Sequence, residues 1–118
     1  MRILQQNCQR SALGSIELNN SVTRLADPSY ICLVQEPYNP RGKIANIPAE
    51  ADFVVADCEG PRAAIYASRD LQLTKINSLC NRDLAVATIV TENTRILVGS
   101  FYMDILLPVE SSAIDAFF

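Results

Sequence analysis

The fold is decided by residues 30–38, which read Tyr30-Ile31-Cys32-Leu33-Val34-Gln35-Glu36-Pro37-Tyr38. Five apolar or aromatic residues run without a break, which is typical of a strand buried on both faces. Pro37 has no backbone N–H, so the strand ladder is expected to stop there. Glu36 then lies at the carboxyl end of a buried strand, the edge where open α/β sheets usually hold ligands. A carboxylate there is either a site residue or a strand-end cap exposed to water.

Residues 1–29 supply a first strand and a helix. Segment 1–7 begins with apolar residues and turns polar, which predicts a strand. Ser11 is a favoured N-cap residue and predicts a helix that runs to about Ala26. The helix is expected to end before Pro28, because a residue that precedes proline avoids the α region. Its apolar face would carry Leu18, Val22, Leu25 and Ala26, with Leu13 and Ile16 outside that face.

Strand, helix and strand within residues 1–36 predict a βαβ unit with parallel strands. Asn7 ends the first strand and Glu36 ends the second, so the two residues are expected at neighbouring strand ends. A carboxylate and an amide there suit a metal-assisted phosphate site, in which Glu36 holds Mg²⁺ and Asn7 orients a ligand or a phosphate oxygen. The alternative is a plain hydrogen bond between the two side chains.

A long proline-containing loop is expected at residues 37–50, and the secondary-structure pattern changes after it. Short β-rich segments without intervening helices predict an antiparallel meander, and they cover residues 52–56, 63–68, 71–76, 84–90 and 95–102. Residues 91–94 would connect a hairpin. We therefore expect an α/β fold in which one helix flanks a mixed, largely antiparallel sheet, with central strands that contain Ile3, Leu33, Val86 and Val98. Residues 109–118 predict the start of a helix, and an end on Phe117-Phe118 within it suggests a cut chain.

The composition is that of one globular domain. The 118 residues are 49% hydrophobic and 19% charged, which provides a packed core and argues against disorder. No apolar run approaches the roughly 18 residues of a membrane span. The amino terminus turns polar too early for a signal peptide, so an intracellular location, nuclear or cytoplasmic, is expected. The scattered cysteines, with no C-x-x-C pair, predict reduced and mostly buried thiols at Cys8, Cys32, Cys58 and Cys80.

The sequence has no histidine. This excludes Ser-His-Asp and Cys-His catalysis and histidine-ligated zinc within these residues. Any metal would need oxygen ligands, which favours a hard cation such as Mg²⁺. The net charge of −3 gives no global basic footprint, which counts against a self-sufficient nucleic-acid binder.

Other candidate side chains are weaker on their own. Tyr102 follows the last predicted strand and would either contact a phosphate oxygen or serve as an amphipathic core tyrosine. Four loop cations would each be a solvated surface charge if taken alone: Arg10, Arg41, Lys43 and Arg62.

Four motifs together resemble one family. They are Gln5-Gln6-Asn7-Cys8-Gln9-Arg10-Ser11, then Val34-Gln35-Glu36-Pro37-Tyr38 with Gly42-Lys43, then Arg62-Ala63-Ala64-Ile65-Tyr66, then Ser100-Phe101-Tyr102-Met103-Asp104. In this order they resemble the amino-terminal half of an endonuclease/exonuclease/phosphatase domain. The Q-x-N-x-x-R-S and Q-E-P-Y forms are most similar to the endonucleases of non-LTR (LINE-type) retrotransposon polyproteins, rather than to abasic-site repair endonucleases.

The resemblance implies half of a four-layer α/β sandwich, with residues 1–118 as a single partial domain, and Mg²⁺-dependent cleavage of DNA. Glu36 matches the family's metal-binding glutamate, Asn7 the asparagine near the scissile phosphate, and Tyr102 the tyrosine that contacts the phosphate. The same motifs and their neighbours supply candidate nucleic-acid contacts at Arg10, Tyr38 and Arg62.

The sequence departs from the family because the Asp-x-Asn motif and the closing Asp-His pair belong to a second half. We therefore expect a fragment without independent activity, whose sheet face opposite the helix is apolar and uncovered. Its partners would be DNA and the carboxyl-terminal half of the domain, in an element that nicks chromosomal DNA to prime reverse transcription. The alternatives are another phosphodiesterase or phosphatase of the superfamily, or a non-catalytic remnant.

Overall fold

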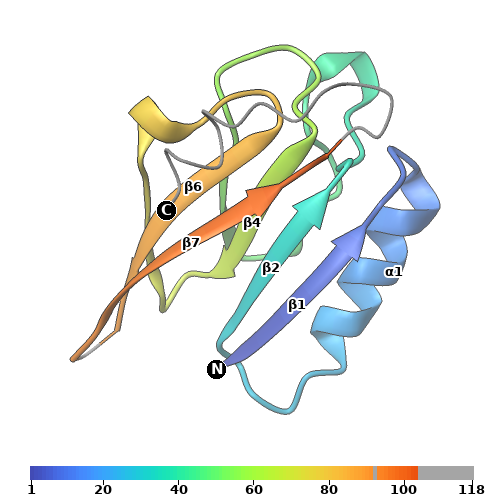
Figure 1. Cartoon of the computed structure of the whole chain (residues 1–118). Coiled ribbons are helices and arrows are strands. Elements are labelled where there is room, and N and C mark those ends of the chain that lie inside the picture. Colours follow the sequence, from blue (N-terminus) through green and yellow to red (C-terminus); the bar gives the residue numbers. More distant parts are fainter. Residues whose placement is uncertain (92, 104–118) are drawn as a thin grey trace.

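Two β-sheets packed face to face, with one helix on the outer side of the larger sheet, form the architecture of the computed structural model (Figure 1), which describes residues 1–91 and 93–103. In chain order the elements are β1 (Arg2–Asn7), α1 (Ala12–Thr23), β2 (Tyr30–Gln35), β3 (Ala51–Val54), β4 (Ala63–Ser68), β5 (Gln72–Lys75), β6 (Leu84–Val90) and β7 (Arg95–Phe101). Single 3₁₀ turns lie at Pro40–Gly42 and Asn77–Leu79. The helix expected after residue 108 lies outside the described residues.

The sheets have simple topologies. Sheet A has the strand order β1-β2-β4-β3, in which β1 and β2 are parallel and the other pairs are antiparallel. Sheet B is the antiparallel meander β5-β6-β7. The predicted hairpin connection is confirmed, since the N–H of Thr91 donates to the C=O of Thr94 at 2.9 Å. The predicted α/β class, the βαβ unit and the half-sandwich architecture are confirmed.

The expectation of one mixed sheet was wrong in its strand order. β2 and β6 are central, as predicted for Leu33 and Val86, but Ile3 lies on edge strand β1, and β7, which contains Val98, is an edge strand among the described residues. The second central strand of sheet A is β4, in which every residue is buried. Residue alternation reveals which side chains are buried, but it does not reveal to which of two stacked sheets a strand belongs.

Helix α1 is positioned by its first turn. The hydroxyl oxygen of Ser11 accepts the N–H of Gly14 at 3.0 Å, which confirms the predicted N-cap. Gly14 packs so closely on the end of β1 that a Cβ atom there would lie 2.4 Å from the carbonyl oxygen of Cys8. The helix ends at Thr23 rather than near Ala26, because the backbone already turns at residue 24.

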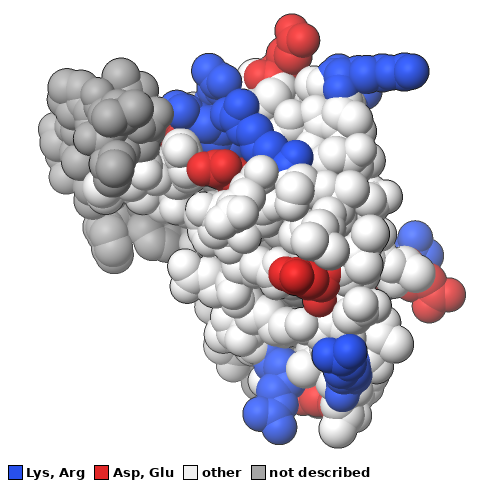
Figure 2. Space-filling view, turned by 90° about the vertical axis from the view of Figure 1, so that its right-hand side faces the viewer, with Lys and Arg blue, Asp and Glu red and all other residues white. Residues whose placement is uncertain are grey.

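The face of sheet A under α1 is shared between the helix and the loop at residues 37–50. As predicted, Leu18 is buried and Leu13 and Ile16 are exposed. Asn46 from the loop donates to the Ser15 hydroxyl at 3.1 Å, and a cluster under both segments contains Tyr30, Cys32, Val34, Tyr66, Ile44 and Ile47. Seen from this side, Lys and Arg gather toward the upper and lower ends, and the middle is mostly uncharged (Figure 2).

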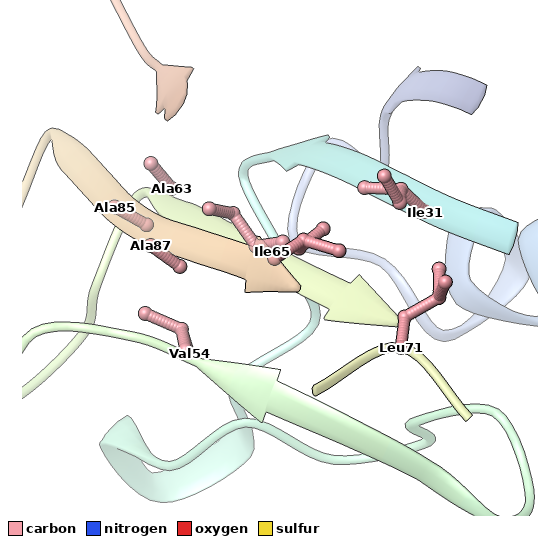
Figure 3. Packing of buried hydrophobic residues seen from close by; sticks show 8 residues of the cluster. Ile31, Val54, Ala63, Ile65, Leu71, Ala85 and Ala87 are labelled. Atoms are coloured by element: carbon pink, nitrogen blue, oxygen red, sulfur yellow. The ribbon is translucent and has the colours of Figure 1, made fainter. Parts of the chain in front are cut away.

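The main core lies between the two sheets (Figure 3). Sheet A contributes Ile31, Val54, Ala63 and Ile65, and sheet B contributes Ala85, Ala87 and Ile89, with Leu71 from the connection between the sheets. The predicted uncovered sheet face was therefore wrong, because β5–β7 of this same protein cover it. Among the described residues, the β1 side of this face is the exposed part, where Ile3 is 63% exposed. Burial of a large aliphatic side chain contributes about 1.5–3 kcal/mol, so this second layer is a major source of stability.

The cysteines are unpaired thiols, as predicted. Cys8 and Cys32 are buried, Cys80 is half-buried and Cys58 is exposed. No helix within residues 1–91 and 93–103 has the length and apolar character needed to cross a membrane.

Candidate functional site

The predicted pair Asn7 and Glu36 lies at one edge of sheet A. β1 and β2 run in parallel with Asn7 opposite Gln35, so Glu36 comes directly after the residue that pairs with Asn7. The ladder continues one step further, because the N–H of Cys8 donates to the C=O of Gln35 at 2.9 Å. The carboxyl ends of β1 and β2 therefore stay together where the two residues leave the strands.

The backbone at this edge adopts unusual conformations. Gln9, Arg10 and Glu36 have φ angles of 53°, 54° and 46°, in the left-handed region that residues other than glycine rarely adopt. Glu36 is held on both sides, since its N–H donates to the C=O of Arg62 at 2.9 Å and its C=O accepts the N–H of Arg10 at 2.8 Å. Each such conformation costs on the order of 1–3 kcal/mol and persists where surrounding contacts enforce it.

The Asn7 and Glu36 side chains do not bond to each other within the described part of the protein. The Asn7 Oδ1 atom instead accepts the N–H of Gln9 at 2.8 Å, which stabilises the turn after β1. Among residues 1–91 and 93–103, neither the amide hydrogens of Asn7 nor the carboxylate of Glu36 has a hydrogen-bond partner. The alternative of a direct hydrogen bond between the Asn7 and Glu36 side chains is therefore not observed among the described residues.

Ser100 ties β7 to the end of β2. This residue is 1% exposed, and its hydroxyl donates to the C=O of Val34 at 2.7 Å and accepts from the Gln35 amide nitrogen at 3.1 Å. Tyr102 follows two residues later, and its N–H donates to the C=O of Asp83 at 2.8 Å. The fourth sequence motif is thus bonded directly to the second, across the two sheets.

Arg62 directly precedes β4, and its side chain is only 11% exposed. Its Nε and Nη2 atoms donate to the two carboxylate oxygens of Asp83 at 2.5 and 2.8 Å, a bidentate ion pair. The guanidinium carbon lies 4.8 Å from the centroid of the Tyr102 ring. Arg62 is therefore a partnered side chain and not a solvated surface charge.

Asp83 was missed by sequence reasoning. It follows Asn81 and Arg82 in a segment that resembles an ordinary turn, and it comes 21 residues after its partner Arg62. The only available signal was an acidic residue directly before a strongly apolar strand.

The other predicted nucleic-acid contacts are more exposed. Arg10 is exposed in the turn after β1, and its backbone contacts Glu36 as described. Tyr38 is half-buried, and its C=O accepts the N–H of Ala45 at 3.0 Å. Arg41 and Lys43 are exposed in the following loop. A group of basic side chains occupies the upper end of the view in Figure 2, the end toward which β1 and β2 point in Figure 1.

The donors at this edge suit a metal bound by few protein ligands. Within the described residues, no group of three or more His, Cys, Asp or Glu side chains could enclose a cation. Glu36 supplies one carboxylate, while the Asn7 Oδ1 atom already accepts the N–H of Gln9. Mg²⁺ is commonly held by one or two carboxylates together with waters and substrate phosphate oxygens, so the donor set fits Mg²⁺ better than a metal that needs a full protein cage.

A separate hollow of about 330 Å³ opens beside the end of β3, and its walls include Lys43, Phe53, Cys58 and Pro61. It contains none of the residues Asn7, Glu36 or Tyr102. The candidate site is therefore an open strand-end edge and not this hollow.

No protein-family model matches the sequence, and no curated protein matches it. Among solved structures, the protein is similar to the endonuclease domain of TRAS1, a telomere-specific non-LTR retrotransposon, with a TM-score of 0.71 and 26% sequence identity over 96% of this chain. The predicted resemblance is confirmed. The match covers 50% of the TRAS1 structure, so the 118 residues correspond to half of that domain and have a nuclease-like fold.

Proposed function

We propose that this protein is one half of a Mg²⁺-dependent DNA endonuclease domain of a non-LTR retrotransposon, which nicks DNA to prime reverse transcription. The observation that carries the proposal is the meeting of all four sequence motifs at one edge, where they are bonded through Glu36, Gln35, Arg62 and Ser100. The likeness to the TRAS1 endonuclease supports DNA as the substrate. Its partners would be DNA and the second half of the domain, inside the cell.

Each residue has a distinct proposed role. Glu36 would hold Mg²⁺ through its carboxylate. A bound Mg²⁺ ion supplies Lewis-acid stabilisation of the charge on the phosphate. The Asn7 amide hydrogens and the Tyr102 phenol would donate to phosphate oxygens, while Arg10 and Tyr38 would contact the DNA backbone nearby.

The same inventory limits what these 118 residues can do alone. They include no histidine to act as a general base, and the described residues hold no group of three or more His, Cys, Asp or Glu side chains that could enclose a cation beside Glu36. A single carboxylate with mostly water ligands binds Mg²⁺ weakly. We therefore expect the 118-residue protein to leave supercoiled plasmid intact in the presence of Mg²⁺.

The decisive experiment extends the protein with the second half of the domain and measures nicking of supercoiled plasmid. The extended protein should nick, and Glu36→Gln should reduce the rate at least about a hundredfold, the scale seen when one group that stabilises the charge of a transition state is removed. Glu50→Gln, at the opposite end of sheet A, is the matched control and should change the rate less than about twofold. Full activity in the Glu36→Gln protein would overturn the metal-ligand assignment.

Two other outcomes would favour the alternatives. Release of phosphate from small phosphomonoesters without nicking would indicate a phosphatase of the same fold. A well-folded extended protein that hydrolyses neither substrate would indicate a non-catalytic remnant.

A further inference from the structure

Asp83 makes contacts to two segments that both belong to the candidate site. Its carboxylate binds Arg62 with two hydrogen bonds, at 2.5 and 2.8 Å. Its backbone carbonyl oxygen accepts the N–H of Tyr102 at 2.8 Å. One residue at the start of β6 therefore fixes both the guanidinium and the backbone from which the tyrosine ring extends.

The bidentate ion pair with Asp83 fixes the orientation of the Arg62 guanidinium. The guanidinium is planar, and two parallel hydrogen bonds to one carboxylate fix its orientation as well as its position. In that orientation it lies 4.8 Å from the Tyr102 ring centroid, within the range of a cation–π contact. The C=O of Arg62 also accepts the N–H of Glu36 at 2.9 Å, so the same residue contacts the proposed metal ligand.

We infer that Asp83 is a positioning residue of the site: it orients Arg62, whose guanidinium holds the Tyr102 ring and whose C=O holds the backbone of Glu36. The effect of Asp83 on catalysis rests on the proposed function, whereas the positioning of Arg62 and Tyr102 by Asp83 does not. It assigns to Arg62 a role in holding Tyr102, and it gives Asp83 a role that no motif of this sequence indicates.

The structural part is tested on the 118-residue protein by NMR, without any activity assay. Nuclear Overhauser contacts should connect Arg62 side-chain protons with Tyr102 ring protons. Asp83→Ala and the isosteric Asp83→Asn should weaken or abolish them and leave the remaining backbone spectrum unchanged. The control is Asp57→Asn, which removes the carboxylate of an exposed ion pair with Lys75 and should preserve them. Unchanged Arg62–Tyr102 contacts in both Asp83 variants would overturn the inference.

The catalytic part is tested by a double-mutant cycle in the extended domain. Asp83→Asn should lower kcat for plasmid nicking about tenfold when Tyr102 is present, but less than about twofold in a Tyr102→Phe background, because residues that act as one unit give non-additive effects. Equal losses in both backgrounds would show that Asp83 acts without Tyr102 and would overturn the inference. If the extended protein does not nick at all, the proposed function fails, and the NMR result still decides the positioning role.

Discussion

Sheet A has a glutamate with a left-handed backbone at each of its two ends, and the two are held in different ways. Glu50, with φ of 58°, directly precedes β3 in a local turn, in which the N–H of Ala51 donates to the C=O of Pro48 at 3.2 Å. A positive φ at the third position is what a type II turn requires. Glu36, with φ of 46°, has no turn of this kind, and its two backbone bonds join it to Arg10 and Arg62.

The difference teaches that the same backbone state can have two causes. At Glu50 it follows from a short-range turn, and a glycine would serve equally well. At Glu36 it is imposed by segments far apart in the sequence, at a position where only a side-chain function would favour glutamate over glycine. Strain that tertiary contacts enforce is concentrated at functional sites, which supports the assignment of the Glu36 end as the site.

The largest expected effect concerns thiol reactivity at the Glu36 end. Burial raises the pKa of Cys8, next to Asn7, to about 11 and that of Cys32 to about 12, so both thiols stay protonated and shielded at pH 8. Alkylation by iodoacetamide, read by mass spectrometry, should modify exposed Cys58 at least about a thousandfold faster than either, equivalent to about 4 kcal/mol of protection. If Cys8 reacted a hundredfold faster than Cys32, the edge of sheet A that carries Cys8 and Glu36 would open locally. The backbone contacts of Glu36 would then not hold this edge closed.

The next effect concerns the close approach of α1 to the end of β1. Gly14→Ala places a methyl group against the Cys8 carbonyl, where no flexible side chain is available to yield. The gain in helix propensity of about 1 kcal/mol should be exceeded, with a net loss of about 1–3 kcal/mol in the free energy of unfolding by urea. Asn20→Ala, on an exposed helix position, is the control and should be slightly stabilising. A Gly14→Ala protein as stable as the wild type would contradict the observed packing.

The parts of the fold that the sequence predicted are those with short-range causes. Ser11 caps α1 within its own first turn, Asp27-Pro28 separates the helix from β2, and Pro37 comes two residues after the end of that strand. Because parallel strands end at the same edge, the neighbourhood of Asn7 and Glu36 followed from the βαβ unit alone.

The parts that could not be predicted depend on long-range pairing. The assignment of β5, β6 and β7 to a second sheet needs contacts across layers, and single-strand patterns do not encode them. The Arg62–Asp83 pair joins two turns that carry no mutual signal, and a left-handed Glu36 contradicts the local preference of glutamate. These features, which sequence reasoning missed, lie mainly at the candidate site, where local rules are most often broken for function.

The smallest expected effect is a change of stability when either left-handed glutamate becomes glycine. Glycine adopts positive φ without steric cost, which favours the folded state by about 1 kcal/mol, and part of this gain is offset by the greater freedom of glycine in the unfolded state. Since the hydrogen bonds of Glu36 and Glu50 are made by the backbone, Glu36→Gly and Glu50→Gly should both raise the free energy of unfolding in urea by about 0.5 kcal/mol. In the extended domain, only Glu36→Gly should also abolish plasmid nicking. The contrary result would be a Glu36→Gly protein that is less stable than the wild type while the Glu50→Gly protein is more stable. It would show that the Glu36 side chain supports the fold. Metal binding would then no longer be needed to explain why a strained glutamate occupies this position.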